Sequence, residues 1–317
     1  MDSYHQLQQL LDSVVTDIAD RQRLVEAMSA VGADISGIHV TPTNTSETAE
    51  PKHGADDLET QPSAPISNSS TQNISSGCCP TAAESTVSNS TAQIQGAEVD
   101  LGRAVRCGFP EVVYGEGKPP ELVVNVFRTQ QAAGQPSLAT RVSPEQAVAV
   151  QNAFPDAIYH SAARTIRRSA ETQQNQQHAQ TIGQVAVVTA GSCDLPVAAE
   201  AIETLAWMDV PATLIEDVGV AGPQRLLKHV PELQKMKCIV CVAGMEAALP
   251  SVLAGHVNCP VIGVPTSVGY GASFMGVAAL LSMLNCCASN VVTVNIDGGF
   301  RGGYVAGMIA TGQNRHP

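Results

Sequence analysis

The C-terminal part of the chain alternates regularly between apolar runs and segments with helical spacing. Near-continuous apolar runs predict buried strands, and the stretches between them place apolar residues at intervals typical of helices. The expected strands are Val185–Thr189, Ala212–Glu216, Cys238–Ala243, Val261–Val264 and Val291–Ile296; the expected helices are Leu195–Trp207, Pro223–His229, Glu246–Ala254 and Ser273–Leu284. Buried strands separated by helices indicate a parallel sheet covered on both faces. We therefore predict an α/β fold, a three-layer flavodoxin-like parallel sheet over residues 181–317.

The same patterns recur on a smaller scale before this domain. They predict a small α/β domain over residues 99–170, joined to the next domain by a polar stretch at 171–180. Its expected strands are Glu111–Tyr114, Ser137–Arg141 and Ala157–His160, and its expected helices are Pro120–Ala133 and Pro144–Phe154.

The first hundred residues divide into two further segments. Residues 1–35 carry leucines and valines at amphipathic spacing, which predicts an N-terminal helical segment. Residues 36–98 are rich in Ser, Thr, Asn, Pro and Ala. Such a segment buries too little apolar area to offset an ordering entropy of about 1–2 kcal/mol per residue. We predict that it is a disordered insert.

Composition narrows the functional classes. The chain has 317 residues, 44% of them hydrophobic and 3% aromatic, and a formal charge of −12. That charge argues against a general affinity for nucleic acid or an anionic membrane. The richest apolar run, Val277–Leu284, is too short to span a bilayer, and no secretory leader is recognisable, so we expect a cytoplasmic protein. Nine cysteines, an odd number, are then expected to be free thiols.

A glycine turn after the first strand of the C-terminal domain is the first candidate for chemistry. In Gly191-Ser192-Cys193-Asp194, Ser192 is placed to donate to a phosphate and Asp194 to cap the following helix, whose N-terminus favours an anion. A capped helix start without any ligand remains an equal alternative. The turn has neither the Gly-Lys-Ser/Thr of a Walker loop nor the Gly-x-Gly-x-x-Gly of a dehydrogenase.

A carboxylate and a thiol are the remaining candidates. Glu246 follows a strand end in an apolar neighbourhood, where poor solvation would raise its pKa toward that of a useful acid or base. The alternative is a first-turn helix acid favoured by the helix dipole. Cys287 follows a helix C-terminus, which disfavours a thiolate, so a reactive thiol needs a cationic partner such as the ring of a substrate; otherwise it is a small buried residue. Cys238 and Cys241 lie an odd number of residues apart in a strand, so they are expected on opposite faces as core thiols, and no metal site is expected.

Seven motifs carry a family resemblance from Val99 to Ile309. They are Arg106–Lys118, Thr140–Glu145, Ala190–Ala198, Glu216–Gly222, Gly244–Pro250, Gly263–Gly271 and Asn295–Phe300. In this order they resemble the LarB family, which begins the synthesis of the nickel-pincer nucleotide cofactor used in lactate racemase maturation. The C-terminal domain is similar to the aminoimidazole ribonucleotide carboxylase (PurE) fold.

The resemblance implies a reaction and a set of residues. It implies that CO2 or bicarbonate carboxylates the pyridinium ring of nicotinic acid adenine dinucleotide and that the phosphoanhydride is cleaved, giving pyridinium-3,5-biscarboxylic acid mononucleotide and AMP. Cys287 is then the nucleophile and Glu246 the base. The substrate-binding residues expected are Gly191, Ser192, Asp194, Asp217, Gly244, Met245, Thr266 and Ser267. Mg2+ is a further expected participant in hydrolysis, and a homo-octamer built on the C-terminal domain is expected.

The sequence also departs from the family pattern. Cys286 stands where the family usually has serine, so two adjacent thiols compete, and the alignment of Ala288 favours Cys287. Ser192-Cys193 replaces the usual Thr-Ser. The first alternative function is an aminoimidazole ribonucleotide carboxylase or mutase, which the lack of histidine in Gly244–Pro250 disfavours. The second is a nucleotide-binding module without catalysis.

Overall fold

The computed structural model describes residues 91–170 and 184–312. The expected helical segment 1–35, the polar stretch 171–180 and most of the expected insert lie outside the described residues. The predicted end of the insert, residue 98, is wrong. Strands β1 (Thr91–Ile94) and β2 (Ala97–Asp100) form an antiparallel hairpin in which Val99 is buried. The sequence patterns missed this short hairpin because its composition resembles that of the polar segment before it. The apolar residues that pack against Val99 come from the rest of the folded domain.

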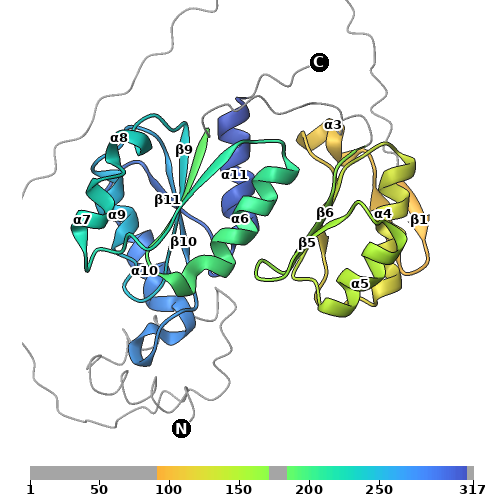
Figure 1. Cartoon of the computed structure of the whole chain (residues 1–317), viewed down its shortest axis with the longest axis horizontal. Coiled ribbons are helices and arrows are strands. Elements are labelled where there is room, and N and C mark those ends of the chain that lie inside the picture. The colour runs from red at the N-terminus through yellow and green to blue at the C-terminus, as the bar shows by residue number, and fades with distance from the viewer. Residues whose placement is uncertain (1–90, 171–183, 313–317) are drawn as a thin grey trace, which may run out of the picture. The chain divides into compact units, whose positions relative to one another are not determined.

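The C-terminal domain is built on a five-stranded sheet with strand order β11-β10-β9-β7-β8 (Figure 1). All four neighbouring pairs are parallel, and every residue of β7, β9 and β10 is buried, which explains why these strands read as continuous apolar runs. The strands are β7 (Val185–Thr189), β8 (Ala212–Ile215), β9 (Cys238–Ala243), β10 (Val261–Pro265) and β11 (Val291–Thr293). The predicted parallel sheet is confirmed, with β11 ending three residues earlier than expected.

Helices cover both faces of this sheet, which confirms the three-layer prediction (Figure 1). One face carries α6 (Leu195–Trp207) and α11 (Gly299–Thr311), and the other carries α7 (Pro223–Leu227), α8 (Val230–Leu233), α9 (Leu249–Ala254) and α10 (Val277–Leu284). Cys238 belongs to the first core and Cys241 to the second, as their odd spacing predicts. Helix α9 begins at Leu249 rather than at Glu246. The helix predicted from Ser273 is a 3-10 segment, η3 (Gly271–Gly276), followed by α10.

The sequence patterns did not predict α11, because its glycines argue against a helix when read alone. In the structure those glycines let α11 approach α6 closely. A Cβ atom added to Gly303 would lie 2.6 Å from the carbonyl oxygen of Ala201 on α6. The contact with α6 therefore explains a helix that local propensity disfavours.

The N-terminal domain contains a four-stranded mixed sheet with strand order β3-β4-β6-β5. Its elements are α3 (Arg103–Cys107), β3 (Val113–Tyr114), α4 (Pro120–Ala132), β4 (Ser137–Thr140), α5 (Pro144–Ala153), β5 (Ile158–His160) and β6 (Thr165–Arg168). Strand β6 was not predicted, because its two arginines hide the strand pattern. The Arg167 Nε atom lies 2.7 Å from the carboxylate of Glu203 on α6, so this strand also contacts the C-terminal domain.

No helix in the described ranges is long and apolar enough to cross a membrane.

The contact between α6 and α11 gives a stability prediction. Gly303→Ala forces a methyl group against the Ala201 carbonyl, so we expect the free energy of unfolding to fall by about 1–3 kcal/mol despite the better helix propensity of alanine. Met308→Ala, at an exposed position of the same helix, is the control and is expected to change stability little. Urea titrations followed by circular dichroism measure both variants. Equal stability of Gly303→Ala and the unmodified chain would contradict the prediction, because it would show that α6 and α11 can move apart to accept the methyl group without a loss of stability.

Candidate functional site

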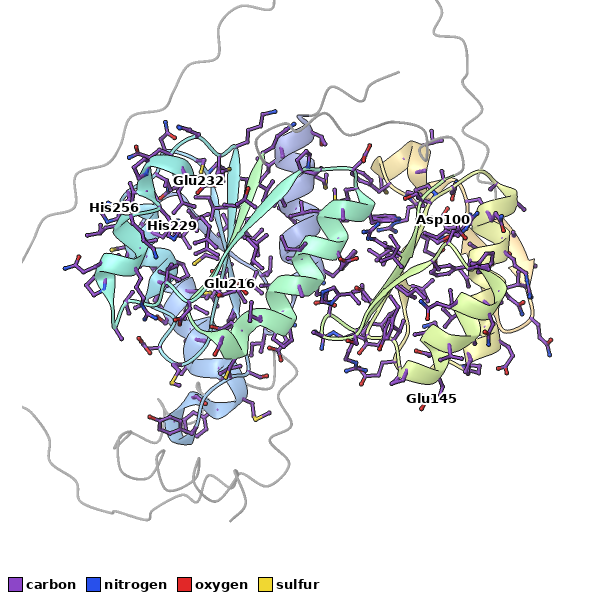
Figure 2. All side chains as sticks on the ribbon, in the orientation of Figure 1. Asp100, Glu145, Glu216, His229, Glu232 and His256 are labelled. Carbon is purple, nitrogen blue, oxygen red and sulfur yellow. The ribbon has the colours of Figure 1, made fainter. Side chains whose placement is uncertain are left out.

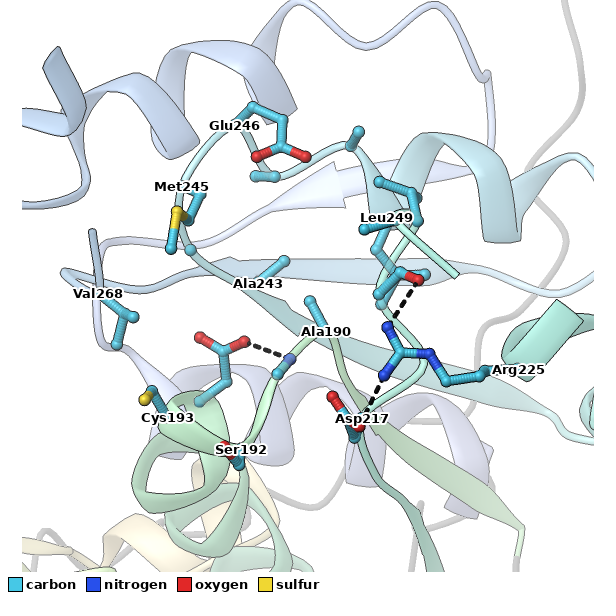
Figure 3. A pocket seen from close by; sticks show the side chains of 18 residues that line it. Ala190, Ser192, Cys193, Asp217, Arg225, Ala243, Met245, Glu246, Leu249 and Val268 are labelled. Atoms are coloured by element: carbon cyan, nitrogen blue, oxygen red, sulfur yellow. Dashed lines mark hydrogen bonds and ion pairs between the residues drawn. The ribbon is translucent and has the colours of Figure 1, made fainter. Parts of the chain in front are cut away.

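A cavity of about 370 Å³ opens at the carboxyl ends of the parallel strands. The turns after β7, β8 and β9 form its walls, because parallel strands bring their carboxyl ends to one edge of a sheet. Figure 3 shows Glu246 at one wall and Ser192 and Asp217 at the opposite wall. Gly191, Asp194, Gly244 and Met245, which were expected to bind substrate, also line it.

Asp194 is buried beneath this cavity and ties two of the strand ends together. One carboxylate oxygen accepts a hydrogen bond from the Gly191 N–H at 2.9 Å, and the other accepts one from the Thr266 hydroxyl at 2.7 Å. Burial raises the pKa of Asp194 above its ordinary value, and the hydrogen bonds from Thr266 and Gly191 offset part of that rise. The expected capping takes another form. Asp194 makes no side-chain cap of α6, but its carboxylate accepts from the Gly191 N–H and so caps the 3-10 turn Ser192–Asp194 that leads into α6.

Thr266 and Ser267 do not line the first cavity. Thr266 is fully buried, and its hydroxyl is engaged with Asp194. The Ser267 N–H donates to the carboxylate of Asp297 at 2.8 Å, and Ser267 lines a second, adjacent cavity. Thr266 is therefore a positioning residue for the first cavity.

The turn between β9 and α9 holds Glu246 in an unusual backbone conformation. Met245 and Ala247, on either side, have φ values of 54° and 50°, the left-handed region that non-glycine residues seldom adopt. Gly244 approaches its neighbours so closely that an added Cβ would lie 2.6 Å from the Thr266 hydroxyl oxygen. The turn thus presents Glu246 at the cavity wall.

Two expectations about Glu246 are corrected by this geometry. Its side chain is exposed, so the poor solvation expected from the apolar sequence is absent in the single chain. It also lies three residues before α9, so it is not a first-turn helix acid. The sequence patterns missed the turn because left-handed φ values at Met245 and Ala247 have no signature in residue type.

The turn after β8 and helix α7 contribute a charged pair that spacing alone did not reveal. The Arg225 guanidinium donates to the Asp217 carboxylate at 2.6 Å, and both residues line the cavity (Figure 3). Asp217, with φ 55°, is fixed by its own N–H, which donates to the Thr189 hydroxyl at 3.0 Å. Ser192 is exposed at the start of the turn that leads into α6, where peptide N–H groups favour an anion. Arg225 thus gives the cavity a cationic side chain, and the turn at Ser192 gives it a wall that favours an anion.

Cys287 does not lie in this cavity. It is exposed in the segment between α10 and β11, before the strand begins, whereas the cavity lies where the strands end. The backbone confirms this placement, because the Val261 N–H at the start of β10 donates to the carbonyl of Asn290 at 2.8 Å. A strand of five residues is roughly 16 Å long, so Cys287 and Glu246 of one chain lie at opposite edges of the sheet. The neighbouring Cys286 is half-buried.

The described histidines of the C-terminal domain, His229 and His256, belong to no group of three or more possible metal ligands. Figure 2 shows His229, Glu232 and His256 beside the helices on the α7–α9 side of the sheet. Across residues 91–170 and 184–312, no three His, Cys, Asp or Glu side chains come together as metal ligands.

Comparison with known proteins decides the family. Residues 91–170 match the LarB/PurE-like N-terminal domain, and residues 184–316 match the AIR carboxylase domain. An uncharacterized protein of Methanocaldococcus jannaschii is 39% identical over 219 residues, which cover 67% of this chain and 83% of that protein. The chain belongs to the LarB family. Its two domains make it a LarB/PurE-type enzyme of the carboxylase and mutase group.

Two aminoimidazole carboxylases and mutases are similar to only part of this LarB family chain. An N5-carboxyaminoimidazole ribonucleotide mutase of Mycobacterium tuberculosis is 31% identical over 125 residues, 38% of this chain and 70% of that protein. A phosphoribosylaminoimidazole carboxylase of Ogataea methanolica is 33% identical over 102 residues, 32% of this chain but 18% of that protein. The crystal structure of a Treponema denticola PurE2 variant aligns with a TM-score of 0.33 at 19% identity, covering 38% of this chain and 76% of that one.

Cysteine reactivity tests the placement of the thiols. Burial raises the pKa of Cys238 to about 12 and also raises the pKa of Cys241 and Cys259, so these thiols hold almost no thiolate near neutral pH. We expect iodoacetamide at about pH 8 to label the exposed Cys107, Cys193 and Cys287 at least tenfold faster than these three. Peptide mass spectrometry over a time course measures the rates. Fast labelling of Cys238 in the folded chain would contradict the buried strand.

Proposed function

We propose that this protein carboxylates the pyridinium ring of nicotinic acid adenine dinucleotide with CO2 and hydrolyses the phosphoanhydride, giving pyridinium-3,5-biscarboxylic acid mononucleotide and AMP. One observation carries the proposal. A LarB-type N-terminal domain is joined to an AIR carboxylase domain whose strand-end cavity carries Glu246 and is lined by no histidine. The family resemblance associates a histidine in this turn with the purine carboxylase, so its absence favours the pyridinium reaction over that alternative.

The electronic demands of the reaction explain the need for a thiol. A pyridinium ring is electron-poor and does not attack CO2. When the Cys287 thiolate adds to the ring, the positive charge is lost and the product is a neutral enamine with a nucleophilic carbon. That carbon forms a bond to CO2, a base removes the proton from the same carbon, and departure of the thiolate restores the aromatic ring. No net oxidation occurs, and the thiol is regenerated.

The cavity supplies the remaining groups. Glu246 is the proposed base, because its carboxylate stands at the wall of a cavity whose lining is otherwise mainly apolar. Ser192 and the N–H groups at the start of α6 are the proposed contacts of the mononucleotide phosphate. Met245 and Leu249 offer apolar surface to a ring. Water attacks the phosphoanhydride in the second half of the reaction.

Mg2+ remains a proposed participant in the hydrolysis only. The buried Asp194 carboxylate is engaged with Gly191 and Thr266, and the Asp217 carboxylate is paired with Arg225. These residues do not present a set of metal ligands, although Mg2+ commonly uses substrate phosphates and waters for most of its ligands. The carbon–carbon bond-forming steps above involve no metal.

The position of Cys287 extends the proposal to a second copy of the chain. Since the thiol and Glu246 of one chain are separated by the length of the sheet, we propose that Cys287 enters the cavity of a neighbouring copy. The elements that flank Cys287 expose apolar side chains suited to such an interface: Leu281 and Leu284 on α10 and Val292 on the edge strand β11 are 50%, 61% and 52% exposed. A closed homo-oligomer such as the expected octamer repeats this contact at every site.

Labelled bicarbonate tests the reaction. With nicotinic acid adenine dinucleotide, the protein is expected to form AMP and a pyridinium product that carries the label. Cys287→Ala is expected to abolish both the product and any covalent adduct detected by mass spectrometry, because no enamine forms. Cys286→Ala is the matched control, and its activity is expected to stay within about threefold, because the half-buried thiol is not the nucleophile. Loss of activity in Cys286→Ala alone would reverse the assignment, and binding without turnover would favour the non-catalytic module.

Mixing two inactive variants tests whether the site is shared. Cys287→Ala and Glu246→Gln are each expected to be inactive, and co-expression with different tags yields mixed oligomers. Suppose that one copy supplies the thiol to a site and another copy supplies the base. In a mixed oligomer half of the thiols and half of the bases are intact, so random assembly restores both groups in roughly a quarter of the sites. If both groups act within one copy, mixed oligomers stay as inactive as their parents, which would refute the exchange of Cys287.

A further inference from the structure

A second cavity of about 250 Å³ adjoins the first. The two cavities share Cys193 and Val268 in their walls, so they are neighbours at the same edge of the sheet. The second cavity lies between the LarB-type domain and the C-terminal domain, which belong to one compact unit. Arg141 and Arg164 line it from the N-terminal domain, and Glu200, Ser267 and Asp297 line it from the C-terminal domain.

The backbones of both arginines are held in a conformation that arginine seldom adopts. Arg141 follows β4 with φ 55°, and Arg164 precedes β6 with φ 52°, both in the left-handed region. The two segments fix one another, because the Val142 N–H donates to the Arg164 carbonyl at 2.9 Å and the Arg164 guanidinium donates to the Arg141 carbonyl at 3.3 Å. Strained non-glycine residues of this kind cluster at ligand sites. Here the strain is found in two cationic residues that line one cavity.

Contacts with the C-terminal domain hold Arg141 in place. Its guanidinium donates to the carbonyl oxygen of Asp297, and its Nε atom lies 3.4 Å from the buried Glu200 carboxylate. That carboxylate is fixed in turn, because it accepts a hydrogen bond from the Phe300 N–H at 3.0 Å. The Arg141 side chain nevertheless remains 31% exposed, and that of Arg164 46% exposed. The Arg164 guanidinium also lies 3.9 Å from the Glu116 carboxylate. Both arginines thus line the cavity while part of each side chain stays exposed.

We propose that this second cavity is a phosphate subsite, in which Arg141 and Arg164 bind the phosphoanhydride and the adenylate half of a dinucleotide whose other half occupies the first cavity. Guanidinium groups suit phosphate oxygens because their planar N–H groups pair with two oxygens at once. The first cavity, near the lower end of the 300–1,000 Å³ range of ligand pockets, has room for about one mononucleotide, so a dinucleotide needs the adjoining space. The inference rests on the proposed function and assigns a role to the N-terminal domain.

Binding measurements separate the two cavities. Calorimetry with the full chain compares nicotinic acid adenine dinucleotide with nicotinic acid mononucleotide. For Arg164→Gln we expect the dissociation constant of the dinucleotide to rise roughly tenfold, as for the loss of one hydrogen bond to a charged group, while that of the mononucleotide stays within about twofold. Arg141→Lys keeps the charge beside Glu200 but removes the planar fork, and it is expected to show the same selective loss.

Arg167→Gln is the matched control. Arg167 also pairs with a carboxylate of the other domain, Glu203, but it does not line either cavity, so both ligands are expected to bind as before. Equal loss for both ligands, no loss, or the same selective loss in Arg167→Gln would overturn the subsite. Failure of the proposed function is distinguishable: selective dinucleotide binding without labelled product would leave the subsite standing, and labelled product with unselective binding would refute the subsite alone.

Discussion

The candidate site depends on one buried carboxylate. Asp194 accepts hydrogen bonds from the turn after β7 and from Thr266 after β10, so it fixes the strand ends on which the cavity is built. Burial disfavours the charged carboxylate of Asp194, and the hydrogen bonds that it accepts offset part of this cost. Without the carboxylate, the buried Thr266 hydroxyl would lose its acceptor. Gly244, packed against Thr266 and Val268, completes this arrangement and brings the Glu246 turn to the same edge. The Glu246 turn and the turn after β7 are therefore held in place by buried residues.

A parallel sheet imposes a second constraint, because residues before a strand and residues after it lie on opposite edges. Glu246 follows β9 and Cys287 precedes β11, so no adjustment of loops within one chain readily brings them together. The proposed reaction needs both groups, so the proposal requires that two copies of the chain share each site. The exposed leucines of α10 and the short edge strand β11 suggest where such an assembly forms.

The sequence patterns predicted the layers of the C-terminal domain well, because strands such as β7 and β9 are buried on both faces and helix α6 has a regular apolar side. The sequence patterns failed for elements whose structure depends on a contact with another element. Helix α11 needs the glycine contact with α6, and β6 needs acidic partners for its arginines. The turn around Glu246 depends on backbone angles without a residue signature. Arg141 lay within a motif that carried the family resemblance, but its neighbour Arg164 and their shared cavity appear only once the chain is folded. The separation of Cys287 from Glu246 was already implicit in the predicted parallel sheet, because Glu246 follows one expected strand and Cys287 precedes another.

The close contact between α6 and α11 has a consequence for the face of the sheet that these helices cover. Added Cβ atoms at Gly299 and Gly303 would lie 2.1 and 2.6 Å from carbonyl oxygens of α6, so sliding of one helix past the other meets steric resistance. The connection from β10 to α10, on the other side of the sheet, is different. There Phe274 and Met275 adopt left-handed angles, and Tyr270 and Met275 are 81% and 72% exposed. The domain thus combines tight backbone packing on one face of the sheet with an exposed connection on the other.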